Sequence, residues 1–159
     1  MAENEQPQTE RLFQVQRIYV KDLSFESPNA PGIFSGDWQP KHELNLNTKV
    51  NRVNDDTHEV VLSVTVTTKM GEQTAFIVEV EQAGLVSIKG FPEGELGQLL
   101  GAYCPNLLFP YAREVISDLV TKGSFPQLVL QPVNFDALYA QHRQQMAEQL
   151  KAQSGKGAH

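Results

Sequence analysis

Cysteine is almost absent from this chain, since Cys104 is the only thiol among 159 residues. A single cysteine cannot form an internal disulfide, which is typical of proteins that work in a reducing compartment. The polar residues 1–7 lack the apolar run of a signal peptide, and no later stretch approaches the ~20 apolar residues that span a bilayer. We therefore expect a cytoplasmic protein that does not insert directly into a membrane.

The residue patterns of catalysis and of cofactor or metal binding are also lacking. The four histidines are scattered without the spacing of zinc ligands, and no glycine-rich phosphate loop is present. Cys104 precedes a proline, and a small buried side chain is a simpler interpretation of it than a nucleophile. Asp55 and Asp56 fall in a predicted turn, where adjacent carboxylates are usually solvated. The sequence therefore favours a protein that is not an enzyme and that has no cofactor and no metal site.

A basic surface is missing as well, because the chain carries a net charge of -6. The acidity is concentrated in residues 22–95, which hold twelve acidic and five basic side chains. Residues 1–21 are balanced, and residues 96–159 carry a net charge of +1. An acidic surface repels the phosphates of nucleic acids and attracts basic partners. We therefore expect no nucleic-acid binding.

The composition is that of a folded globular protein, with 40% apolar and 20% charged residues. The length suits one domain with a single core. We expect a disordered N-terminus over residues 1–10, one domain over residues 11–151, and a flexible tail over residues 152–159.

Four strands are predicted in the first part of the domain, over residues 12–25, 42–50, 59–69 and 73–82, and residues 85–88 can extend the last strand. Each of them has one apolar and one mixed face, as in antiparallel sheets that are covered on one side only. In the first strand, period-two alternation assigns the apolar side chains to one face with two polar exceptions, Arg17 and Lys21. That face comprises Phe13, Val15, Tyr19, Leu23 and Phe25.

Helices are predicted to follow and to cover the apolar face. A short helix over residues 95–102 is expected to end before Pro105, because the residue before a proline disfavours helix. Asn106 is expected to cap a second helix that ends at Gly123, and Asn134 to cap a third. The predicted fold class is therefore α+β, a four-stranded antiparallel sheet with helices packed on one face.

Apolar surface is the remaining candidate for a functional site. The loop over residues 27–40 is long, rich in Pro and Gly, and carries Phe34 and Trp38. These aromatics can fold back on the core or form the wall of a groove for apolar segments, and the two roles are compatible. The groove predicted for such segments comprises Phe34, Trp38, Leu44, Leu46, Leu138 and Tyr139.

Several long strings of the sequence resemble the SecB chaperone family. In chain order they are residues 16–26 (QRIYVKDLSFE), 59–66 (EVVLSVTV), 101–114 (GAYCPNLLFPYARE), 123–128 (GSFPQL) and 132–138 (PVNFDAL). Together the resemblance covers roughly residues 11–140. Long strings in a fixed order are far more specific than any short motif.

The resemblance implies a non-catalytic export chaperone without a cofactor. Members of the family bind unfolded precursor proteins in apolar grooves and deliver them to the SecA translocation motor. They assemble as a dimer of dimers, with first strands pairing across subunits and helices sandwiched between two sheets. The resemblance assigns motor docking to Asp22, Glu26, Ile77 and Glu79, which strand alternation places on mixed faces.

We expect a homotetramer on two further grounds. The apolar stripe over residues 108–120 and the strand face of Phe76, Val78 and Val80 both require burial. One subunit of this size has little capacity to bury a core and a second apolar surface, and closed symmetric assembly is the usual alternative. The tetramer interface is therefore predicted at Phe76, Val78 and Val80.

Two other function classes remain open from the sequence. A carrier protein would enclose one compact apolar ligand between sheet and helix, and would ignore unfolded chains. An enzyme that uses Cys104 would lose activity on Cys104→Ser, whereas a chaperone would not.

Overall fold

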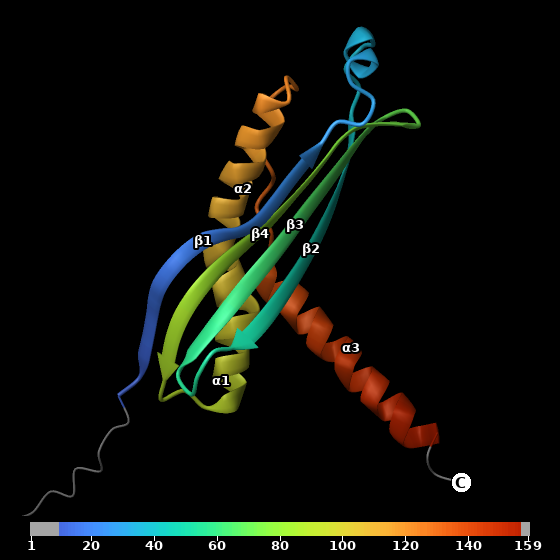
Figure 1. The fold of residues 1–159 in the computed structure, drawn as a ribbon. Helices are drawn as coiled ribbons and strands as arrows, with labels where there is room; N and C mark the ends of the chain where they lie inside the picture. The colour runs from blue at the N-terminus through green and yellow to red at the C-terminus, as the bar shows by residue number, and fades with distance from the viewer. Residues whose placement is uncertain (1–9, 157–159) are drawn as a thin grey trace, which may run out of the picture.

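A four-stranded antiparallel sheet in the order β1-β4-β3-β2 forms the body of the molecule (Figure 1). The structure, a computed structural model, describes residues 10–156. The strands are β1 (Leu12–Glu26), β2 (Lys41–Arg52), β3 (Thr57–Met70) and β4 (Gln73–Lys89). The predicted fold class is confirmed, and the apolar piece 85–88 belongs to β4. The disorder expected for residues 1–10 falls, apart from Glu10, outside the described residues.

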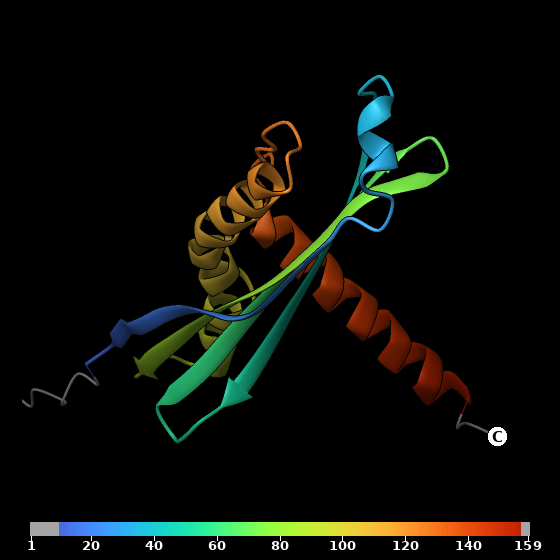
Figure 2. The same ribbon diagram turned by 45° about the horizontal axis from the view of Figure 1, so that its top comes forward.

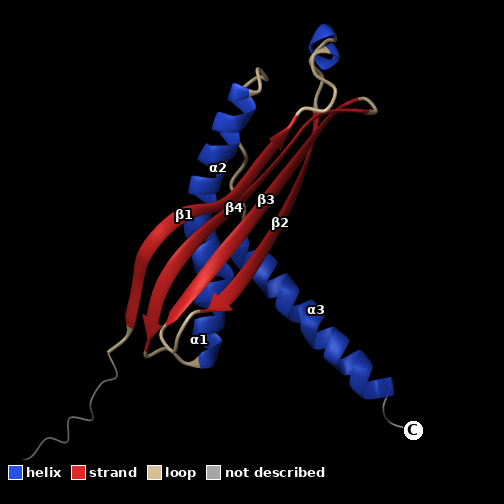
Figure 3. Ribbon diagram, viewed as in Figure 1, coloured by secondary structure: helices blue, strands red, loops and turns tan. Residues whose placement is uncertain are grey.

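The α-helices follow the strands in the sequence, as predicted, and Figure 3 distinguishes the two kinds of element by colour. They are α1 (Glu93–Gln98), a π-helical turn η2 (Leu99–Tyr103), α2 (Cys104–Lys122) and α3 (Phe135–Lys156). Helix α2 lies along one side of the sheet, whereas α3 extends away from it (Figure 2). A short 3-10 turn, η1 (Gly32–Ser35), interrupts the loop between β1 and β2.

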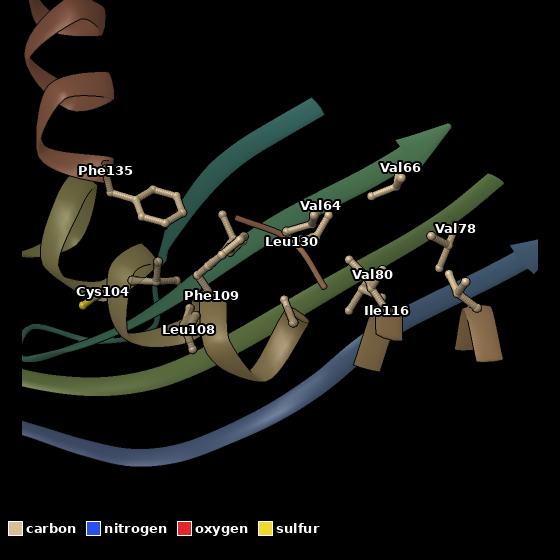
Figure 4. Packing of buried hydrophobic residues seen from close by; sticks show 14 of the residues in the cluster. Val64, Val66, Val78, Val80, Cys104, Leu108, Phe109, Ile116, Leu130 and Phe135 are labelled. Carbon is tan, nitrogen blue, oxygen red and sulfur yellow. The ribbon is translucent and has the colours of Figure 1, made fainter. Parts of the chain in front are cut away.

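The core lies between α2 and the central strands β3 and β4 (Figure 4). Val64 pairs with Val80 and Val66 with Val78, so these side chains share the face under α2. All four are 0% exposed, as is Ile116 of α2. Burial of this kind stabilises the fold by about 1.5–3 kcal/mol for each large aliphatic side chain. The apolar faces predicted for β3 and β4 are therefore confirmed.

Strand β1 departs from the predicted alternation. Its pairing with β4 shifts between Val15 and Arg17 and again between Val20 and Asp22, so that two bulges reverse the side-chain direction. Tyr19 consequently lies on the face opposite α2, and its predicted place on the apolar face is wrong. The face toward α2 instead comprises Phe13, Val15, Ile18, Val20, Leu23 and Phe25.

Pro105 does not end a helix, contrary to the prediction. Tyr103 and Cys104 both keep right-handed helical angles, and α2 continues directly from the π turn. A proline removes one backbone donor and crowds the carbonyl four residues earlier. The wider π turn before Pro105 relieves that crowding, so the helical path survives. Asn106 lies inside α2, and its predicted capping role is therefore wrong.

Helix α2 ends at Gly123 as predicted, but packing, and not a left-handed backbone, is the reason that a glycine is needed there. Its φ is -75°, whereas the following Ser124 takes the left-handed conformation with a φ of 67°. A Cβ at position 123 would collide with the ring of Phe25 on β1. Glycine is therefore required here for the close approach of the helix end to the first strand.

Helix α3 begins at the predicted cap. The side-chain oxygen of Asn134 accepts a hydrogen bond from the backbone N–H of Ala137 at 3.0 Å. Phe135 is buried against the core, whereas Met146 and Leu150 are 50% and 64% exposed. The helix continues beyond residue 152 to Lys156. Only the first turns of α3 therefore contribute to the core.

Candidate functional site

A cavity of about 600 Å³ lies between β2, the π turn and the start of α3. Its polar lining comes mainly from Asn47, Thr48 and the α3 side chains Gln141, His142 and Gln145. Two side chains of β2 form its apolar floor. The apolar residues of its walls belong to η2 and α3. These apolar residues are Leu46, Val50, Leu100, Phe135, Leu138 and Tyr139.

Apolar surface continues along β2 outside the cavity. Leu44, Leu46 and Val50 lie on the face of β2 that is turned toward the core, because they pair with Val66, Val64 and Val60. Strand β2 is at the edge of the sheet, and α2 does not reach it as it reaches β3 and β4. Leu44 is therefore 39% exposed and Val50 40% exposed.

An aromatic cluster lies at the other end of this strip. The ring of Phe125 is central to it, with centroid distances of 5.2 Å to Phe34, 5.5 Å to Trp38 and 4.9 Å to Phe76. Trp38 packs partly against the core, whereas Phe34 stays 48% exposed. Trp38 therefore folds back on the core, whereas the groove-wall role of the exposed Phe34 stays a prediction. Sequence reasoning missed Phe125, whose only signal is an aromatic residue between the helix end and Pro126.

The six residues predicted for the groove thus fall in two places that β2 connects. Leu46, Leu138 and Tyr139 line the cavity, and Phe34 and Trp38 belong to the aromatic cluster. Leu44 lies on β2, next to Leu46 along the same face. We call this combined surface the apolar track.

The four residues predicted for motor docking share the opposite face of the sheet. Glu26 pairs with Ile77, and Ser24 pairs with Glu79 two residues further along the same two strands, so these side chains lie on one face. Asp22 pairs with Glu81, which adds another carboxylate to this face. Among residues 10–156, the ion pairs within 4.0 Å include none of the carboxylates of this acidic face.

A hydrogen-bonded network crosses the same face beside these carboxylates. The carboxylate of Glu59 on β3 accepts hydrogen bonds from the Tyr19 hydroxyl, from Lys21 Nζ at 2.7 Å and from Asn51 Nδ2 at 3.1 Å. Tyr19 and Lys21 belong to β1, so the network passes over β4, where the small Ala83 leaves room for it. It therefore ties three strands together and neutralises Lys21 close to the acidic face.

The network sets the ionisation of its members. Hydrogen bonds from Lys21 and then from Tyr19 lower the pKa of Glu59 from 4.5 to about 2. Burial, followed by the hydrogen bond to Glu59, raises the pKa of Tyr19 to about 12. Glu59 is therefore charged and Tyr19 neutral at every physiological pH.

We expect acid to weaken the fold through Glu59. Its pKa is lower in the folded chain, so the unfolded chain binds more protons between pH 4.5 and about 2. The stabilisation from Glu59 is complete above this window and is lost as the pH falls through it. The midpoint of urea unfolding, measured at pH 5 and pH 3, should fall less for Glu59→Gln than for the wild type. Glu43→Gln, on the exposed part of β2, should behave like the wild type, and equal acid sensitivity of all three proteins would contradict this expectation.

The predicted tetramer interface is wrong. Phe76, Val78 and Val80 are each 0% exposed within the single chain. They lie in the core cluster with α2, so they have no surface left to contact a second subunit. Alternation correctly assigns their shared face, but that face is covered by the chain's own helix.

Cys104 has the environment of a core residue. It is 1% exposed, and burial raises the pKa of its thiol to about 12, so it stays protonated. Across residues 10–156, histidine, cysteine and acidic side chains form no group that could hold a metal ion. In the same residues, no helix is long and apolar enough to cross a membrane.

Comparisons with known proteins agree with this architecture. The family model described as "Preprotein translocase subunit SecB" matches residues 5–146. The chain is 58% identical to the protein-export protein SecB of Methylococcus capsulatus over 92% of this chain and 93% of that one. It is 62% identical to the SecB of Nitrosococcus oceani over 84% of this chain and 82% of that one. In fold it is similar to a Mycobacterium tuberculosis SecB-like chaperone in complex with an antitoxin peptide, with a TM-score of 0.64, 20% identity, and coverage of 76% of this chain and 90% of that one.

Proposed function

The chain belongs to the SecB family of protein-export chaperones, and from that premise we propose that it holds precursor proteins unfolded in the cytoplasm and delivers them to the SecA translocation motor. The SecB family is a family of export chaperones and not of enzymes. The burial of the Cys104 thiol is consistent with a protein that does not use it as a nucleophile. The observation that carries the proposal is the apolar track, which leaves large apolar side chains open to solvent beside an edge strand.

The track suits extended apolar segments better than one compact ligand. It runs from the aromatic cluster at Phe34 along Leu44 to the cavity at Leu138, and each of these three side chains is between 39% and 48% exposed. Aromatic and aliphatic surfaces accept many side chains without matching any one of them. This property is what a binder of diverse unfolded chains requires.

A carrier of small apolar ligands is the second candidate. The cavity of about 600 Å³ is within the usual size range of ligand sites. A carrier would bind a compact apolar molecule with a saturable affinity and leave the refolding of other proteins unchanged. The open strip along β2 favours the chaperone, because a carrier has no use for apolar surface outside its cavity.

We further propose assembly as a homotetramer, through surfaces other than the one predicted from the sequence. Tyr103 of η2 and Tyr111 of α2 are each 50% exposed, and Val129 is 58% exposed. Exposed aromatic side chains of this kind are typical of subunit contacts. Light scattering of the purified chain gives the mass of the assembly.

Motor docking is proposed at the acidic face, with Ile77 as its apolar centre among Asp22, Glu26 and Glu79. Uncompensated carboxylates steer a basic partner to this surface, and salt weakens that encounter. Since Glu59 neutralises Lys21, no free cation of this network opposes the attraction.

Asp22→Lys/Glu79→Lys is expected to weaken SecA binding about tenfold or more, because two attractive charges become repulsive. The holding of unfolded chains should persist, because the apolar track lies on the other face. Affinity for SecA and arrest of refolding are measured in parallel. Glu72→Lys/Glu148→Lys gives the same change in net charge at exposed positions away from the acidic face and should bind SecA like the wild type. Equal losses for both double variants would mean that only net charge matters, and loss of holding would mean that the two surfaces are not separate.

A further inference from the structure

The side chain of Tyr139 on α3 packs closely against two glycines, Gly97 of α1 and Gly101 of the π turn, and we call this contact the glycine seat. The Tyr139 hydroxyl lies where a Cβ of Gly97 would be only 2.7 Å away, and the ring lies where a Cβ of Gly101 would overlap Cδ2 and Cε2. The guanidinium of Arg143 lies 5.9 Å from the ring centroid. The ring is therefore held between α3's own Arg143 and the bare backbone of α1 and the π turn.

The seat lies where α3 joins the rest of the molecule. Gln98 Nε2 donates to Asp136 Oδ1 at 2.9 Å, and the rings of Phe109 and Phe135 are 5.7 Å apart. After these contacts the side chains from Gln141 to Gly155 are exposed. The direction of α3 is consequently set within its first turns.

The residues of this contact also line the cavity. Gly97, Gly101 and Tyr139 all line it, and Leu46 lines it from β2. A change in the seat would move α3 relative to β2, and so change the width of the apolar track.

We propose that Gly97 and Gly101 are positioning residues for the client groove, because they let Tyr139 approach closely enough to fix α3 beside β2. This proposal rests on the proposed holding function and names the residues that set its groove width. Neither glycine contacts the client through a side chain of its own, since both act through Tyr139.

Gly97→Ala separates this role from helix stability. Alanine favours a helix over glycine by about 1 kcal/mol, so the substitution should strengthen α1 itself. Its Cβ would meet the Tyr139 hydroxyl, and we expect the displaced helix to weaken binding of an unfolded polypeptide about fivefold to tenfold. The polypeptide is reduced, carboxymethylated lactalbumin, and its affinity is measured by fluorescence anisotropy. Gly94→Ala in the same helix has no atom within 4 Å of its new Cβ and should bind like the wild type.

Tyr139→Phe supplies the rescue. Without the hydroxyl, the nearest atom to a Cβ at position 97 is Cζ at 3.9 Å, an ordinary contact. Gly97→Ala/Tyr139→Phe should therefore bind within about twofold of Tyr139→Phe alone. Gly101→Ala collides with the ring itself, so Tyr139→Phe should not rescue it. Wild-type affinity in Gly97→Ala, or a double variant as weak as Gly97→Ala, would overturn the proposal.

Amide hydrogen exchange keeps this proposal distinct from the proposed function. Exchange over residues 139–150 should be faster in Gly97→Ala than in the wild type and should return to the wild-type rate in the double variant. If the wild type failed to bind the unfolded polypeptide, the holding function would be wrong, and the exchange rates would still test the seat. Unchanged exchange in Gly97→Ala would contradict the positioning role whatever the binding result.

Discussion

Val78→Asp should leave no stably folded subunit. The Val78 side chain is 0% exposed and belongs to the core cluster that packs under α2. A carboxylate at this place would be buried without a partner, which costs several kcal/mol after relaxation. A loss of about 4–5 kcal/mol is a large share of the total stability of a domain, so circular dichroism and urea unfolding should both report a largely unfolded chain.

Ile77→Asp is the matched control for that substitution. Ile77 is the preceding residue on the same strand but lies on the opposite, partly exposed face beside Glu26. It receives the same carboxylate without burying it, and the chain should keep its fold. If Val78→Asp instead gave folded single subunits, Val78 would lie at a subunit contact and the observed core packing would be contradicted.

The central strands could be predicted from the sequence because nothing interrupts their alternation. From Val60 to Val66, every second residue is apolar, and Val64 and Val66 pair with Val80 and Val78 of β4. Strand β1 could not be predicted to the same detail. Its bulges reverse the side-chain direction twice, and the period-two rule has no means to detect an unpaired residue. The polar exceptions Arg17 and Lys21 were the visible sign of those bulges.

The predicted interface failed because alternation shows which residues share a face but not what covers it. Val78 and Val80 pack against α2, which lies more than twenty residues later in the chain. The break predicted before Pro105 failed for a related reason. The rule for residues before proline describes a regular helix, whereas the π turn has room for the ring.

The candidate site was predictable where it depends on exposed apolar residues within one element. Leu44, Leu46 and Leu138 follow from local patterns, whereas Phe125 and the glycine seat of Tyr139 depend on contacts between segments far apart in the sequence. A glycine in a short helix has no distinctive local signal, and only the three-dimensional contact shows its role.

Leu46→Lys/Leu138→Lys should abolish most client binding. The two side chains line the cavity from β2 and from α3, and each substitution removes apolar area while adding a charge that resists desolvation. A combined loss of about 3 kcal/mol corresponds to roughly a hundredfold weaker affinity for an unfolded polypeptide. Leu138 is 43% exposed, so a lysine there can extend into solvent without unfolding the chain.

Asn45→Lys/Leu150→Lys is the matched control, since it adds the same two charges to the same strand and helix. Asn45 lies on the opposite face of β2, and Leu150 is 64% exposed near the end of α3, outside the cavity. Its client affinity should stay within about twofold of the wild type. Equal losses in both double variants would assign the effect to charge alone and contradict the groove.

Arrest of refolding tests the central claim most directly. An unrelated protein is diluted out of denaturant in the presence of this chain, and the recovery of its native fluorescence is followed over time. The wild type and Asn45→Lys/Leu150→Lys should slow or prevent refolding as their concentration rises, whereas Leu46→Lys/Leu138→Lys should have little effect. Unhindered refolding in the presence of excess wild-type chain would contradict the proposal that this protein holds other proteins unfolded.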